Sequence, residues 1–329
     1  MRIFFILAII WCLSKTYAPA QDNVTATTGL KFSSTQIWKI GIVLTGQDRP
    51  SRGAFACTPV PQDFPEQKVR IIDRDVSAKV RKIKFRNLGS GARQMVINIP
   101  HIAAGESIRS VLTFEVQKQH FSAPDKTDAY RLNHRTSREL RNYLRPSPFI
   151  ESQHPEIVSL ARMFEHPSQS TWSRIETIYD WVRQNVAYVD SKLEGALAAL
   201  RDGNGDCEEM TSLFIALCRA NKIPARTVWV PGHCYPEFYV LDETGKGHWF
   251  PCQAAGDRSF GEITESRPIL QKGDSFRIPG TPQNQPLRYA QIVGSQPGSG
   301  LAHPQVEIVH QQVLTITAPA TEQVNPATP

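Results

Sequence analysis

The N-terminal third of the chain alternates apolar and polar residues with a period of two. Successive side chains of a β-strand point to opposite faces, so this period predicts strands with one buried face. Turn-rich pieces such as 89–91 and 103–106 separate the alternating stretches, which favours an antiparallel sheet or sandwich. We expect no chemistry there, because 57–61 is predicted as a loop in which nothing near Cys57 supplies a base. The predicted strands are 37–44, 68–76, 80–86, 94–99 and 108–116.

The spacing of the apolar residues changes after the proline-containing stretch 144–148. Apolar residues then recur every three or four positions over 157–164 and 172–186, which predicts helices. Aromatic residues at this spacing indicate a helical core rather than a ligand cage. The aromatic positions concerned are Trp172, Tyr179 and Trp181.

A further apolar stripe with helical spacing begins just after Cys207. Asp206 and Glu209 have the spacing of a capping box, so Cys207 is predicted in the first helical turn, where backbone N–H groups favour a thiolate. Asp206, Glu208 and Glu209 oppose this, because nearby negative charge disfavours ionisation of a thiol. Two interpretations stay open at this point: Cys207 is a nucleophile, or it is the first buried member of the stripe. The stripe consists of Met210, Leu213, Phe214, Leu217 and Cys218.

A nucleophilic Cys207 needs an imidazole partner, and His233 is the candidate. His233 follows the short apolar run 227–230 and a Pro231-Gly232 turn, so it is predicted at the edge of a strand. His248 is the competing base, but it follows a turn-like segment and is predicted to be exposed.

Short motifs then follow one another in a fixed order along 205–251. They are Gly205-Asp206-Cys207, Leu213-Phe214 with 216–220, Ile223-Pro224-Ala225-Arg226, His233 with Glu237, and Trp249-Phe250-Pro251. This ordered combination resembles the transglutaminase-like superfamily of bacterial proteins over about 150–255. The resemblance implies an α+β fold with a papain-like core, preceded here by the antiparallel β-sandwich.

The resemblance also implies roles for particular residues. Cys207 would attack an amide carbonyl, His233 would transfer the proton, and a third residue would orient His233. The family usually has an aspartate shortly after its Trp-x-Pro motif, whereas this chain has Gln253. An amide oxygen can accept the Nδ1–H bond of His233 but brings no negative charge, and Asp257 is a lesser candidate. Cys234 also replaces a usual alanine and is a second thiol near the site, a possible disulfide or redox partner of Cys207.

The function predicted from these residues is cysteine protease or amidase activity, or transfer of the acyl group to an amine. Because Gln253 lacks the negative charge that would orient His233, an alternative stays open, in which the domain is a catalytically silent binding or structural module. A metal site of cysteines and His233 is disfavoured, because the spacings contain no Cys-x-x-Cys knuckle. No cofactor is expected, since the chain has no phosphate-binding glycine loop.

The first 20 residues have the form of a cleavable secretory signal. Arg2 precedes an apolar run over 3–12, and Ala18-Pro19-Ala20 provides a cleavage site. The run is too short for a membrane-spanning helix, so we expect a periplasmic or extracellular protein acting on protein, peptide or cell-envelope material. Five cysteines would then remain, an odd number that leaves at least one thiol unpaired within a chain.

The charge balance excludes a nucleic-acid-binding role. The formal charge of +6 for 329 residues falls to +4 without Arg2 and Lys15. Basic residues over 68–86 alternate with apolar ones and are expected on the solvated face of strands.

Taken together, these patterns divide the chain into four parts. They are a signal peptide (1–20), a sandwich-like domain (21–145), a transglutaminase-like domain (146–280) and a largely disordered tail with one possible edge strand (281–329).

Overall fold

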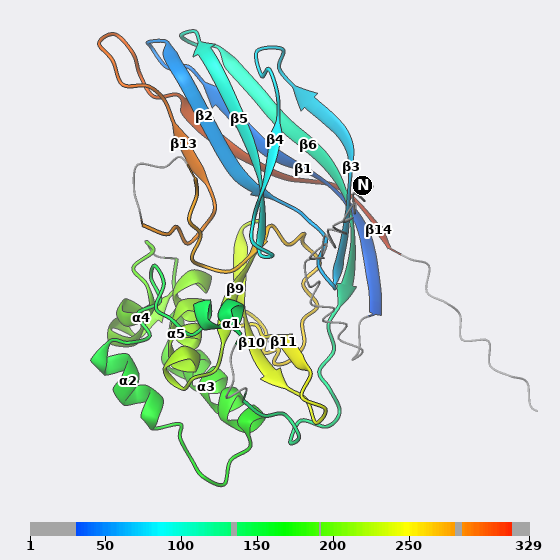
Figure 1. Cartoon of the computed structure of the whole chain (residues 1–329), viewed down its shortest axis with the longest axis vertical. Coiled ribbons are helices and arrows are strands. Elements are labelled where there is room, and N and C mark those ends of the chain that lie inside the picture. Colours follow the sequence, from blue (N-terminus) through cyan, green and yellow to red (C-terminus); the bar gives the residue numbers. More distant parts are fainter. Residues whose placement is uncertain (1–30, 133–136, 191, 280–284, 318–329) are drawn as a thin grey trace, which may run out of the picture.

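The computed structural model describes residues 31–132, 137–190, 192–279 and 285–317, so the predicted signal peptide lies outside the described residues. Two antiparallel sheets face each other at one end of the molecule, and helices cover the continuation of one sheet at the other end (Figure 1). The α+β class is confirmed. Within 31–317 as described, no helix is long and apolar enough to cross a membrane.

The first sheet has the strand order β14-β1-β6-β3. Its strands are β1 (Lys31–Thr45), β3 (Gln67–Val76), β6 (Ser107–His120) and β14 (Gln305–Thr317). The outer face of β3 carries the basic residues predicted to be solvated, and Arg70 on it pairs with Glu115 at 2.9 Å.

The second sheet runs from the sandwich into the helical half without a break. Its order is β11-β10-β9-β12-β5-β2-β13, with β4 beside β5. Gln271 in β12 pairs with Ala92 in β5 on one side and with Trp229 in β9 on the other. The strands are β2 (Ser51–Val60), β4 (Lys84–Leu88), β5 (Ala92–Ile102), β9 (Ala225–Val230), β10 (His233–Leu241), β11 (Gly247–Pro251), β12 (Gln271–Lys272) and β13 (Ile292–Gly294).

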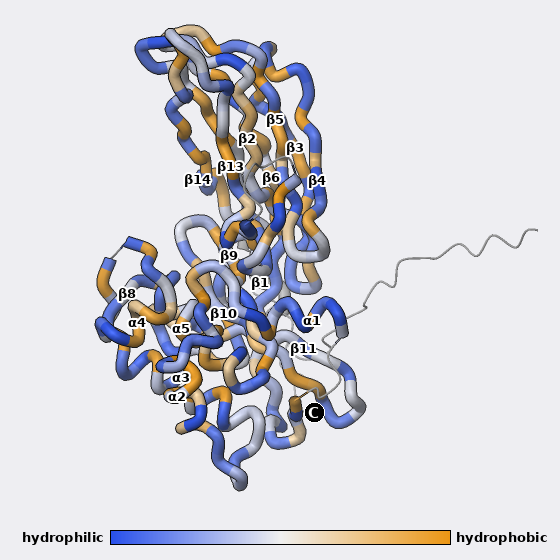
Figure 2. Tube along the Cα trace, turned by 60° about the vertical axis from the view of Figure 1, so that its left-hand side comes forward, coloured by the Kyte–Doolittle hydropathy of each residue, from blue (hydrophilic) through white to orange (hydrophobic). Residues whose placement is uncertain are grey.

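The inner faces of the two sheets form one apolar core. Hydrophobic residues of β1 and β6 meet those of β2 and β5 between the sheets, and the alternating colour of these strands is visible in Figure 2. This alternation is the period-two pattern of the sequence, because only every second side chain points inward. The core members include Ile40, Ile42, Ala56, Ile97, Leu112 and Phe114.

One expectation about this half was wrong. The stretch 57–61 is mostly strand, because β2 extends to Val60. Pro59 lies opposite Gln94 of β5, and β13 pairs with β2 only at 55–57, so β2 has a single strand neighbour at this proline. Cys57 is buried there, and burial raises its pKa.

The tail is also more ordered than its composition suggests. β13 pairs with β2 and β14 pairs with β1, so 292–317 returns to the sandwich from the helical half. The predicted edge strand exists as β14, at the outer edge of the first sheet. Polar residues in 305–317 are compatible with order because β1 supplies the backbone hydrogen bonds.

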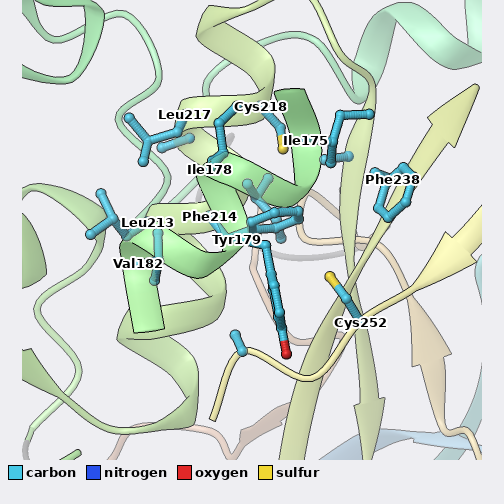
Figure 3. Close-up of a cluster of buried hydrophobic side chains, with 14 of the residues drawn as sticks. Ile175, Ile178, Tyr179, Val182, Leu213, Phe214, Leu217, Cys218, Phe238 and Cys252 are labelled. Carbon is cyan, nitrogen blue, oxygen red and sulfur yellow. The ribbon is translucent and has the colours of Figure 1, made fainter. Parts of the chain in front are cut away.

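Helices form the other half and pack on β9 to β11. Their mutual core contains Tyr179, Phe214 and Phe238 with the sulfurs of Cys218 and Cys252 nearby (Figure 3). Trp172 and Tyr179 are buried, as predicted from their spacing, and Trp181 packs against the same core. The elements are α1 (Arg138–Asn142), α2 (Pro155–Arg162), α3 (Thr171–Asn185), α4 (Ala196–Asp202) and α5 (Cys207–Ala220), with the short strands β7 (Ala187–Tyr188) and β8 (Asn204–Gly205).

Candidate active site

Cys207 is the first residue of α5, where the sequence predicted it. The capping box is present: the Asp206 side chain accepts from the backbone of Glu209, and the Glu209 side chain accepts from the backbone N–H of Asp206. The preceding Gly205 is required by close approach, because a Cβ there would lie 2.4 Å from the Cβ of Glu209. The Gly205-Asp206-Cys207 motif is therefore a tightly closed helix start that fixes the position of the thiol.

The carboxylates near Cys207 are engaged by other groups. Asp206 accepts the backbone N–H of Glu208 at 2.6 Å, and Glu209 accepts those of Glu194 and Asp206 at 3.0 and 3.2 Å. Glu208 forms an ion pair with Arg288, Nε to Oε2, at 3.2 Å. The opposition that sequence reasoning expected from these charges is thus reduced by hydrogen bonds and a counter-ion.

The Cys207 thiol has a pKa lowered to about 5. The largest cause is a hydrogen bond from the thiol of Cys234; burial opposes it, and hydrogen bonding and charge from His233 add to it. Cys207 is only partly buried, and its lowered pKa favours the thiolate at neutral pH.

His233 begins β10 beside the start of α5, and Gln253 lies on its other side. Burial alone would lower the pKa of His233, but contact with Cys207 and the hydrogen bond with Gln253 raise it above its ordinary value. The Nε2 of His233 is 3.3 Å from Oε1 of Gln253. The expected Nδ1 contact is therefore wrong, because the ring turns Nε2 toward the amide.

Two side chains of α3 hold Gln253 in place through its backbone. The hydroxyl of Tyr179 and Nη1 of Arg183 donate to the carbonyl oxygen of Gln253 at 2.8 and 3.0 Å. The Gln253 N–H donates to the carbonyl of Ser259 at 2.8 Å. The backbone N–H and the carbonyl of residue 253 are thus both held, and its side-chain amide is directed at His233.

The other candidate residues lie apart from this arrangement. His248 is buried, not exposed as expected, since its Nε2 pairs with Oδ2 of Asp242 at 2.7 Å and its ring packs against Tyr130 and Phe250. Asp257 is exposed, and in the part of the chain that the structure describes the acceptor facing His233 is Gln253. Across the same described ranges, no group of three or more His, Cys, Asp or Glu is placed to hold a metal ion.

Arg288 is a residue near the site that sequence reasoning missed. Besides Glu208 it donates to Oγ of Ser212 at 2.7 Å and to the carbonyl of Glu208 at 3.1 Å, and its guanidinium lies 5.1 Å from the centroid of the Trp229 ring. It is 5% exposed. Arg288 comes from the segment predicted as a tail, and no motif marks it.

Comparisons with known proteins agree with this architecture. The sequence profile of the transglutaminase-like superfamily matches residues 158–254, which include Cys207, His233 and Gln253. None of the curated proteins compared matches the chain significantly.

Among solved structures, a proposed cysteine protease from Cytophaga hutchinsonii has a TM-score of 0.59 at 17% identity and covers 88% of this chain and 93% of its own. That likeness concerns the fold of both halves. The periplasmic domain of TgpA from Pseudomonas aeruginosa, bound to ethylmercury, has a TM-score of 0.30 at 13% identity, covering 63% of this chain and 96% of its own. The segment that matches the transglutaminase-like superfamily, residues 158–254, is thus the one that contains the thiol at the start of α5.

Proposed function

We propose that this protein is a thiol hydrolase of peptide-type amides, with Cys207 as nucleophile, His233 as acid and base, and Gln253 as the residue that orients His233. The observation that carries the proposal is the contiguous arrangement of the thiol of Cys207, the imidazole of His233 and the amide of Gln253. This is a nucleophile, base and orienting group within one another's reach.

The chemistry follows from the ionisation of the pair. A Cys207 with a pKa of about 5 beside a His233 with a raised pKa favours thiolate and imidazolium at neutral pH. The thiolate attacks the amide carbonyl, and the imidazolium gives its proton to the departing amine. Water activated by the neutral imidazole then hydrolyses the thioester. An amine in place of water would give acyl transfer instead.

The start of α5 offers one backbone donor to the oxyanion. The N–H groups of Glu208 and Glu209 are both directed at the Asp206 side chain, so they are occupied. The N–H of Cys207 itself lies at the first helical position, where no intrahelical acceptor exists. We assign the oxyanion contact to this group.

Gln253 determines how strongly the imidazolium is held. A neutral amide fixes the ring through its oxygen but adds no full negative charge. The lowered Cys207 pKa in spite of this neutral acceptor favours an enzyme over a catalytically silent module.

We further propose that the protein is exported and acts on protein, peptide or cell-envelope material outside the cytoplasm. The signal-like segment 1–20 supports export. Detection of the chain in a periplasmic or culture-medium fraction, with an N-terminus near Gln21, tests this directly.

The experiment that tests the proposed function is the alkylation rate of each cysteine between pH 4 and 9, read by peptide mass spectrometry. The lowered pKa predicts that the rate at which iodoacetamide alkylates Cys207 rises through about pH 5 and then levels off. The rate for an ordinary thiol rises near pH 8.5. Buried Cys218 and Cys252 serve as internal controls, because burial raises their pKa values.

His233→Ala is the companion variant. Loss of the imidazolium removes one cause of the lowered pKa, so the rise in alkylation at Cys207 should move to higher pH. A wild-type Cys207 that reacts like an ordinary thiol would rule out the thiolate pair. If Cys207 is reactive, a peptide library is incubated with and without an added primary amine, and the acyl products are identified by mass spectrometry. Hydrolysis leaves a free carboxylate, whereas acyl transfer leaves a new amide to the added amine.

A further inference from the structure

A second thiol lies directly against Cys207. Cys234 is the residue after His233 in β10 and is 1% exposed. Its sulfur is 3.5 Å from the backbone carbonyl oxygen of Cys207. From the standard C=O and Cα–C bond lengths, that sulfur is at most about 6 Å from the Cα of Cys207. Cys234 is also the largest influence that lowers the pKa of the Cys207 thiol, which places the two side chains close together.

The two thiols differ in the way that a disulfide-forming pair requires. Cys207 is partly exposed and favours the thiolate, which is the form that reacts with oxidants. Cys234 is enclosed, and burial raises its pKa well above the ordinary value, so it stays a protonated thiol that oxidants do not reach first. Redox-sensing sites combine an accessible thiolate with an adjacent resolving thiol in this manner.

The remaining cysteines do not offer this pairing. The sulfur of Cys252 faces the carbonyl of Pro236 at 3.8 Å, Cys218 is enclosed within the helical core, and Cys57 lies in the sandwich. The five cysteines of the described part of the chain are all reduced in this structure. Oxidation is therefore expected at one pair only.

We propose that Cys207 and Cys234 form a reversible disulfide when the protein meets a peroxide, which stops the proposed activity without destroying the nucleophile. In the first step the Cys207 thiolate attacks hydrogen peroxide, the O–O bond breaks, and a sulfenic acid and hydroxide form. In the second step the Cys234 sulfur attacks the sulfenic sulfur, the S–O bond breaks, and its thiol proton leaves with the oxygen as water. A small-molecule dithiol restores both thiols by exchange.

This inference rests on the proposed function only in taking Cys207 as the reactive thiol. The enclosed Cys234 traps the sulfenic acid before a second peroxide converts it to sulfinic acid, a state that dithiols do not reverse. The pair thus protects the site that the lowered pKa makes vulnerable.

The test treats the full-length protein with hydrogen peroxide and identifies the products by non-reducing peptide mass spectrometry. We expect a Cys207–Cys234 linked peptide, loss of Cys207 alkylation, and full recovery of alkylation with dithiothreitol. In Cys234→Ala no linked peptide can form, so Cys207 should pass to sulfinic acid and recovery should be lost. Products are also compared at pH 9, because removal of Cys234 takes away the largest cause of the lowered Cys207 pKa and a higher pH increases the thiolate fraction of the variant.

Cys252→Ala is the matched control, because it removes a buried cysteine that directly follows β11, the strand beside β10, and should oxidise like the wild type. Circular dichroism of each variant verifies the fold, and Cys234→Ser replaces the alanine variant if that one does not fold. The proposal fails if wild-type Cys207 becomes sulfinic acid without a linked peptide, or if Cys234→Ala recovers as fully as the wild type. These readouts follow the thiols, so they stand apart from whether any amide is hydrolysed.

Discussion

At the scale of single residues, the ionisation of Cys207 depends on which partners its neighbours already have. Asp206 and Glu209 accept hydrogen bonds from backbone N–H groups, and Glu208 forms an ion pair with Arg288. The pKa of the Cys207 thiol is therefore lowered by Cys234 and His233. A count of charges along the sequence gives the opposite expectation, since it cannot distinguish an occupied carboxylate from a free one.

The amide of Gln253 gives a prediction at this scale. Gln253→Glu places a carboxylate about where the amide oxygen now lies, 3.3 Å from Nε2 of His233. An opposite charge at this distance favours the imidazolium, so the pKa of His233 should rise by about 1 or more. The titration of His233 followed by imidazole NMR measures this shift.

Gln253→Leu is the control for that change, because it removes the acceptor at similar size. Since the hydrogen bond that His233 donates to the amide oxygen of Gln253 helps raise the pKa of His233, this variant should lower that pKa. Equal pKa values of His233 in both variants would show that Gln253 does not act on the ring.

At the scale of elements, the start of α5 is where the backbone decides the chemistry. The short strands β7 and β8 pair Tyr188 with Gly205, and the capping box follows at once. The chain therefore passes from β8 into α5 with a single residue between them, and Gly205 leaves no room for a Cβ beside Glu209.

Gly205→Ala tests this closeness. The added Cβ would meet Glu209, so the capping box must shift, and a lost cap with local overpacking costs about 1–2 kcal/mol of unfolding free energy. We expect lower stability in urea and slower alkylation of Cys207 near pH 6. In Gly89→Ala an added Cβ meets nothing within 4 Å, and although its φ of +64 costs stability, Cys207 should keep its rate. Equal loss of thiol reactivity in both would contradict the argument.

At the scale of the whole molecule, the second sheet and the C-terminal segment join the two halves. β12 bridges β5 and β9, and the segment that carries Arg288 continues into β13 and β14 of the sandwich. Nε2 of Gln271 donates to the carbonyl of Arg288 at 3.0 Å, which fixes this segment at the junction. The sandwich thereby contributes a buried cation to the helix that begins with Cys207.

Arg288→Met tests this connection. Removing one partner of a buried ion pair leaves the other without compensation, and because Glu208 is 32% exposed we expect a loss of about 2 kcal/mol rather than the full cost of a deeply buried pair. Urea unfolding measures the loss. Glu208→Gln in the same background should regain part of it, since no unpaired charge then remains. A double variant that is destabilised by the sum of the two single changes would exclude coupling between them.

The period-two strands, the helical stripes, the capping box and the order of motifs around Cys207 and His233 could all be predicted from the sequence by itself. They depend on local spacing, which the chain carries in every conformation. The tertiary structure alone decided that the sheet is continuous across the two halves, that β2 persists through Pro59, and that His248 is paired and buried.

The tertiary structure also determined the hydrogen bonds, burial and counter-ions around the Cys207 thiol. The ring of His233 turns Nε2 to Gln253, Cys234 lies against Cys207, and Arg288 pairs with Glu208 from 80 positions further along the chain. Hydrogen bonds, burial and counter-ions belong to neighbours in space, and their sequence separation leaves no periodic trace. The sequence therefore determined which residues could react, and the fold determined which of them carries the charge.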